Sequence, residues 1–176
     1  MNTIEATYRI VTPMFIGGAD QSPSDGIRPP SFKGALRFWW RALHWGNFLQ
    51  DASNDEAQAL QTLHQKEAEL FGSAAQMKNG KQVGGQGSFL LKIEQAQHVQ
   101  FDDKWPAAKP LKGSGYLGIG LWESGSKDKD NFQAHRKSMA STTPFKVTLL
   151  LNQRASGNDK EQLCRSLKAL GLFGGL

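Results

Sequence analysis

Residues 28–43, which read RPPSFKGALRFWWRAL, restrict the fold more than any other part of this sequence. On a helix that turns by about 100° per residue, they separate into two faces. The apolar face, which can enter a protein core, comprises Phe32, Ala35, Leu36, Phe38, Trp39, Ala42 and Leu43. The opposite face comprises Lys33, Arg37, Trp40, Arg41 and His44. The pattern predicts an amphipathic helix that begins at an N-cap, Ser31, and ends near Phe48, with Trp39 in the core and Trp40 outside.

The polar face of this helix carries three cations, an indole and an imidazole. Guanidinium and ammonium groups neutralise phosphates, whereas Trp and Arg offer flat surfaces on which bases stack. An anionic polymer with exposed rings satisfies both kinds of group. The helix therefore predicts RNA as the partner.

Composition places the chain among ordinary globular proteins. Its 176 residues suffice for one domain with its own core, and 21 Lys and Arg stand against 16 Asp and Glu. The single Cys164 excludes an intrachain disulfide framework, and the four histidines show no metal-ligand spacing, so we expect neither a metal nor a cofactor. With no apolar run near membrane length, we expect a cytoplasmic protein without a membrane partner.

Hydrophobic periodicity predicts the order of the remaining elements. Strands are expected at 3–11, 88–94 and 145–151, where apolar residues alternate with polar ones. A second helix is expected to begin with a capping box, Ser53 to Glu56, and to end at Gly72. A final helix from about Asn158 carries its apolar side on Leu163, Leu167 and Leu170.

Between these elements lie two stretches rich in Gly, Ser and polar residues. Residues 72–87 are predicted to form a mobile loop, and residues 95–143 a long irregular insertion in which only Tyr116–Trp122 forms a short strand. The resulting order is βαββα with an extra helix after the first. We therefore predict an α+β, ferredoxin-like (RRM-like) fold in one domain spanning 1–176, one strand short of βαββαβ.

The string TPMFIGGADQSPSDGIRPPSFKGALRFWWRAL resembles the amino-terminal signature of the RAMP superfamily of CRISPR effector subunits. Within it, RPPS-x-KGALRFWWRAL is most similar to the first-numbered subunits of type III-B (Cmr) RNA-targeting complexes. The closing LKALGLFGGL resembles the helix that leads into that family's glycine-rich loop. Because the segment expected after Leu176 and a second ferredoxin-like half are not in the sequence, the resemblance implies the amino-terminal portion of a longer or split protein.

This resemblance implies an RNA-binding subunit of a type III ribonucleoprotein used in antiviral defence. Such a subunit would contact guide RNA toward its 3′ side, target RNA and other RAMP subunits, without cutting RNA itself. By position, Lys33 and Arg37 match the family's basic helix residues, and Ser31 and Gly34 match a turn that lets the backbone approach RNA. The predicted RNA-binding residues are Arg28, Ser31, Lys33, Gly34, Arg37, Trp40, Arg41, His44, His135, Arg136 and Lys137.

Alternative interpretations remain for several residues. His135–Lys137 fit a solvated loop as well as a thumb-like extension on the guide–target duplex. Asp25 or Asp20 would cut target RNA if this chain were a RAMP endoribonuclease, since related backbone subunits use an aspartate in the corresponding loop. An isolated loop aspartate is more often a turn former. In a third interpretation, the chain is a structural end-subunit whose basic face binds a neighbouring protein.

Overall fold

A computed structural model of the chain describes residues 2–18, 22–78, 81–95, 100–104, 120–121 and 133–175. The chain divides into two compact units. The first, here the helical unit, contains residues 1–6, 29–93 and 146–176, and the second contains residues 7–28 and 94–145.

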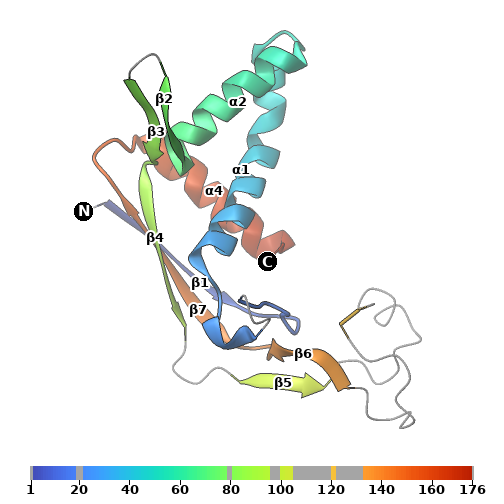
Figure 1. Cartoon of the computed structure of the whole chain (residues 1–176). Coiled ribbons are helices and arrows are strands. Elements are labelled where there is room, and N and C mark those ends of the chain that lie inside the picture. The colour runs from blue at the N-terminus through green and yellow to red at the C-terminus, as the bar shows by residue number, and fades with distance from the viewer. Residues whose placement is uncertain are drawn as a thin grey trace. The chain divides into compact units, whose positions relative to one another are not determined.

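The principal sheet confirms the three predicted strands. β1 (Asn2–Arg9), β7 (Pro144–Leu151) and β4 (Phe89–Gln95) are ordered β1-β7-β4. Beyond the end of β1, Ile10 exchanges backbone hydrogen bonds with residues 142–143, just before β7 begins. The end of β7 meets the start of β4, because the Asn152 N–H donates to the Ser88 carbonyl at 3.0 Å. β7 therefore runs antiparallel to both neighbours, as the predicted ferredoxin-like α+β fold requires (Figure 1).

The first helix, α1 (Pro29–Asp51), begins earlier than its sequence indicated. Ser31 lies inside its first turn, so the prediction of Ser31 as the N-cap is wrong. Pro29 and Pro30 occupy the first two helical positions, where their fixed φ suits a helix and no intrahelical N–H is needed. α1 packs against both other long helices, α2 (Glu56–Phe71) and α4 (Gly157–Phe173) (Figure 1).

The N-cap of α2 is also displaced from its predicted place. Asp55, rather than Ser53, caps the helix and accepts hydrogen bonds from the N–H groups of Ala57 and Gln58 at 3.0 and 3.1 Å. Ser53 and Asn54 have positive φ, which interrupts helical backbone and separates the two helices. The C-cap at Gly72 is confirmed.

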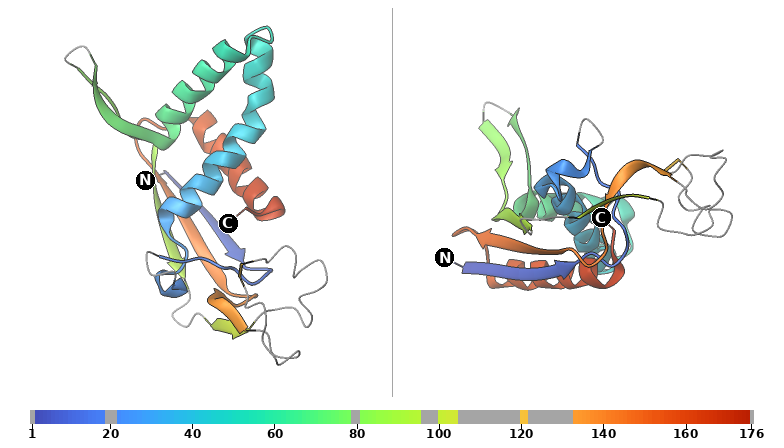
Figure 2. Two further views of the ribbon diagram at one scale, coloured as in Figure 1. Left: turned by 45° about the vertical axis from the view of Figure 1, so that its right-hand side comes forward. Right: turned by 90° about the horizontal axis from the view of Figure 1, so that it is seen from below.

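The prediction of a loop over residues 72–87 is wrong. These residues contain an antiparallel hairpin, β2 (Gly72–Lys78) and β3 (Lys81–Gln86), which extends from the end of α2 (Figure 2). Gly72 has φ 83°, and a Cβ there would lie 2.7 Å from the Gly85 carbonyl oxygen. Close backbone pairing, rather than an alternating apolar pattern, builds this hairpin, so hydrophobic periodicity could not reveal it.

The last helix follows its prediction. Ser156 and Asp159 form a reciprocal capping box at the start of α4, with bonds of 2.8 and 3.1 Å. Leu163, Leu167 and Leu170 are buried, as the sequence indicated. Across the described residues, no helix combines the length and apolar character needed to cross a membrane.

The core of the helical unit reverses the predicted roles of two tryptophans. Trp40 is 1% exposed and lies with Phe32 and Leu36 in the buried stripe of α1, whereas Trp39 is only half-buried. The Trp40 ring packs edge-on against Phe71, with ring centroids 5.9 Å apart. The prediction that Trp40 faces a ligand and Trp39 the core is therefore wrong. The physical reason is that α1 meets α2 and α4 along the side that holds Trp40.

The second unit contains a further antiparallel pair, β5 (Phe101–Lys104) with β6 (Gln133–Met139), and the short 3-10 helix η1 (Pro23–Asp25). Residues 95–143 are thus not irregular throughout. Of the strand predicted at Tyr116–Trp122, only Gly120 and Leu121 are described, and they form a turn.

Candidate nucleic-acid interface

Three cations follow one another along α1 at four-residue intervals. Lys33, Arg37 and Arg41, here called the basic stripe, adjoin the buried stripe of the same helix instead of lying opposite to it. A four-residue step rotates a side chain by only about 40°, so all three stay on one side of the helix. The stripe lies toward α2 because Arg37 and Arg41 pair with a residue of that helix.

That residue is Glu67, which is 7% exposed. Arg41 donates to both carboxylate oxygens, through Nε to Oε2 and through Nη2 to Oε1, the latter at 2.7 Å. Arg37 Nε lies 3.1 Å from Oε1. The hydrogen bond to Glu67 raises the pKa of Arg41, which keeps that group charged. One carboxylate thus pairs with two of the three cations, and the stripe retains an excess positive charge.

Lys33 and Arg37 line a pocket of about 400 Å³ in the helical unit, here called the cationic pocket. Lys33 Nζ lies 5.3 Å from the centre of the Phe89 ring, and Arg37 Cζ lies 5.4 Å from that of Phe71. The rest of the lining is small or uncharged: Gly72, Ser73, Ala74, Gly85, Gln86, Gly87 and Leu90. Among these described lining residues there is no carboxylate, so the pocket favours an anion.

Both cations of the cationic pocket have capacity left for a ligand. Within the part of the chain that the structure describes, Lys33 has no hydrogen-bond or ion-pair partner. The buried Arg37 Nε forms no hydrogen bond, although Glu67 is near, because the carboxylate lies off the N–H direction. Burial, and then the charge of Arg37, lower the pKa of Lys33. An anion in the pocket would favour the charged form of Lys33.

The other predicted residues of α1 have structural roles or stand apart. His44 is held by its own helix, since Nδ1 lies 2.7 Å from the Trp40 carbonyl oxygen and the two rings stack at 5.1 Å. Ser31 and Gly34 are exposed residues of α1, so the turn predicted for them is wrong. A Cβ at Gly34 would meet no atom within 4 Å, which leaves this part of the helix open to a close partner.

The remaining predicted residues belong to the second unit. Asp25, in η1, and Arg28, just after it, are exposed. His135, Arg136 and Lys137 lie exposed on β6. Asp20 lies outside the described residues.

Sequence reasoning missed the partners of the basic stripe. Glu67 stands on the buried side of α2, in line with Ala59, Leu63 and Leu70. A carboxylate at a helical core position is unusual unless it is paired, and this was the available signal. Phe71, Phe89 and the hairpin glycines carried no comparable signal, because they meet Lys33 and Arg37 only in the folded chain.

Comparison with known proteins identifies the family. A model of the RAMP superfamily matches residues 7–176, and this chain therefore belongs to the RAMP superfamily. Its fold is similar to that in the crystal structure of Cmr1 from Pyrococcus furiosus in the apo form, with a TM-score of 0.54 and 18% sequence identity. That match covers 97% of this chain but only 44% of the Cmr1 chain, so this chain spans less than half the length of that Cmr1 chain. No curated protein matches the chain.

Proposed function

We propose that this chain is a non-catalytic, RNA-binding subunit of a type III CRISPR effector, in which it contacts guide RNA and neighbouring RAMP subunits. Membership of the RAMP superfamily and the Cmr1-like fold support such a subunit. The observation that carries RNA binding is the cationic pocket, where Lys33 and Arg37 converge on a space without an acidic group.

The chemistry of the cationic pocket suits a phosphodiester. A phosphate is compact, anionic and rich in acceptors. The Lys33 ammonium is a donor without a hydrogen-bond acceptor among the described residues, and the Arg37 guanidinium adds a second positive charge to the pocket lining. Phosphate contacts position a strand without reading its sequence. Lys33 and Arg37 would therefore bind the RNA backbone independently of its sequence.

Salt dependence tests this proposal directly. Replacing Lys33 and Arg37 together by alanine should weaken binding of a single-stranded RNA oligonucleotide about tenfold or more near 0.1 M salt. It should also flatten the slope of log K against log salt by about 0.7, the contribution of the one phosphate that the cationic pocket would neutralise on a single strand. Fluorescence anisotropy over a salt series measures both quantities.

The matched control is Arg165→Ala with Lys168→Ala, which removes the same charge from exposed positions of α4. Its effect should be small. Equal losses of affinity in the two double variants would mean that Lys33 and Arg37 act only through general electrostatic attraction. Unchanged binding in both variants would contradict the proposal. Lys33→Ala alone provides a variant that breaks no ion pair among the described residues.

Lys33 also makes binding pH-dependent in alkaline solution. Because its pKa is lowered, the free protein loses this charge at a lower pH than an exposed lysine would. The contribution of Lys33 to affinity is present below that pKa and is lost as the pH rises through it. Lys33→Arg should hold its affinity across the same range, since Arg stays charged. Titration with a 2′-O-methyl oligonucleotide, which resists alkaline cleavage, would show the difference, and parallel curves would contradict it.

A further inference from the structure

A second pocket of the helical unit adjoins the cationic pocket. It measures about 780 Å³ and lies among α2, the start of α4 and the base of the β2–β3 hairpin. Ser73, Gly85 and Gln86 line both pockets, so the two spaces share a rim at the hairpin base. A Cβ at Gly85 would meet no atom within 4 Å, so the rim is open at this residue.

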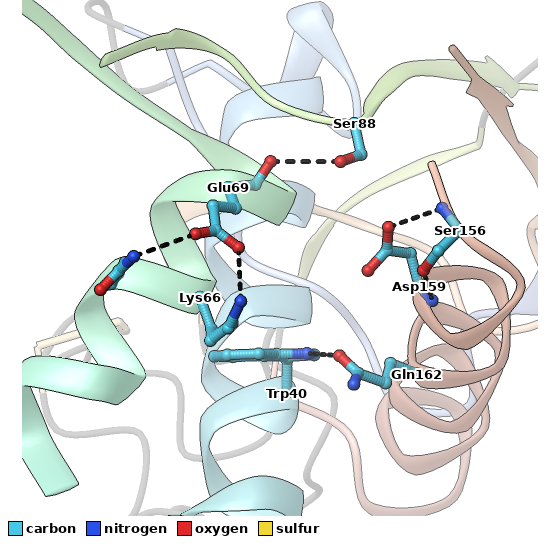
Figure 3. Close-up of polar contacts among 8 residues, drawn as sticks. Trp40, Lys66, Glu69, Ser88, Ser156, Asp159 and Gln162 are labelled. Carbon is cyan, nitrogen blue, oxygen red and sulfur yellow. Dashed lines mark hydrogen bonds and ion pairs between the residues drawn. The ribbon is translucent and has the colours of Figure 1, made fainter. Parts of the chain in front are cut away.

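The charges around the second pocket balance. Lys66 and Glu69 form an ion pair at 2.9 Å, and Asp159 Oδ2 accepts the Ser156 N–H at 2.8 Å (Figure 3). With Arg154, the lining contains two cations and two carboxylates. The side chains of the capping box occupy two N–H groups at the start of α4, which disfavours an anion there. The pocket therefore suits a neutral, polar ligand.

The lining of the second pocket includes a fixed amide and two aromatic rings. Trp40 and Phe48 belong to its lining, and Trp40 Nε1 donates to Gln162 Oε1 at 2.8 Å (Figure 3). Since an indole N–H can only donate, this bond orients the amide, and Gln162 Nε2 has no partner among the described residues. The Asn158 amide and the Arg154 guanidinium lie in the same lining. Amides and guanidinium groups are the side chains that bind the edges of bases.

From this arrangement we propose that the second pocket receives one unstacked nucleobase of the RNA strand whose phosphate lies between Lys33 and Arg37. The inference rests on the proposed function. A single-stranded RNA can turn a base out of its stack, and proteins then bind its edge by hydrogen bonds. The net positive pocket takes the phosphate and the neutral pocket takes the base, with the hairpin base between them. The volume of the second pocket, about 780 Å³, lies within the range of small-molecule sites.

Gln162→Glu tests this base pocket. The variant retains an oxygen for Trp40 Nε1 but replaces the free amide donor by an acceptor. The measurement is the ratio of affinities for an RNA oligonucleotide and for the same backbone made abasic throughout. The wild type should prefer the bases by about fivefold or more, the lower bound for one bound base. Gln162→Glu should reduce this preference at least threefold while leaving the salt slope unchanged.

Gln153→Glu is the matched control, because it adds the same charge at an exposed position outside the pocket lining. It should preserve the preference for bases. Asn158→Ala, at an exposed position of α4, provides a second variant if Gln162→Glu fails to fold, and it too should lower the preference. An unchanged ratio in both pocket variants would overturn the base pocket.

The outcomes separate this inference from the proposed function. If the wild type binds RNA with a salt slope that depends on Lys33 and Arg37, while the pocket variants keep the full preference for bases, only the base pocket fails. If the wild type shows no such salt dependence, the proposed function fails first.

Discussion

Replacing Trp40 by alanine should lower the free energy of unfolding by about 3–5 kcal/mol, as large aromatic truncations in a core do. Trp40 is 1% exposed, contacts Phe71 and Phe48 at ring distances of 5.9 and 6.1 Å, and donates to Gln162. Its removal leaves a cavity where α1 meets α2 and α4. Urea denaturation followed by circular dichroism measures the loss.

Trp39→Ala is the matched comparison, because it removes the same side chain one residue earlier. Trp39 is half-buried, packs on Phe173 with ring centroids 5.3 Å apart, and donates from Nε1 to the Gly174 carbonyl at 2.8 Å. Its loss should cost about 1 kcal/mol, the usual worth of one hydrogen bond. A larger loss for Trp39→Ala than for Trp40→Ala would contradict the observed orientation of α1.

Glu67→Ala should have the second-largest effect, a loss of about 2–3 kcal/mol of stability. Removing one partner of a buried ion pair leaves the other charge uncompensated. Arg37 and Arg41 are 33% and 47% exposed, so water recovers part of that cost and the loss stays below the value for a fully buried pair. Chemical denaturation of the variant and the wild type measures it.

Glu69→Ala supplies the control for Glu67, because it removes a carboxylate two residues later on the same helix. The Glu69 pair with Lys66 is about half exposed on both sides, and such pairs contribute about 0–1 kcal/mol. A double-mutant cycle of Glu67 with Arg41 should show coupling well above that of Glu69 with Lys66. Equal coupling in the two cycles would mean that Glu67 is solvated in solution.

Much of the fold could be predicted from residues near each other in the chain. Alternation of apolar side chains located all three strands of the principal sheet, and the spacing of Leu163, Leu167 and Leu170 located α4 and its buried side. Helix starts were less predictable. Pro29 and Pro30 fit the first turn of α1 as well as the loop before it, and Ser53 and Asp55 were rival caps for α2.

The sequence predicted only part of the candidate site. The amphipathic pattern of α1 identified Lys33, Arg37 and Arg41, and it correctly predicted that Phe32 and Leu36 lie in the core. It failed to orient the helix, because aromatic rings lie on nearly every side of α1. Phe38 is 60% exposed while Trp40 is buried, although both are aromatic.

The sequence by itself determined the three strands of the principal sheet, the three long helices, their ferredoxin-like order and the presence of a basic stripe, since each depends on local periodicity. Only the tertiary structure decided which side of α1 is buried and which cations remain available. Contacts with α2 and α4 come from residues distant in the chain, and they buried Trp40 and set Glu67 against Arg37 and Arg41. The β2–β3 hairpin then completed the cationic pocket around Lys33 through backbone pairing, which leaves little trace in side-chain patterns.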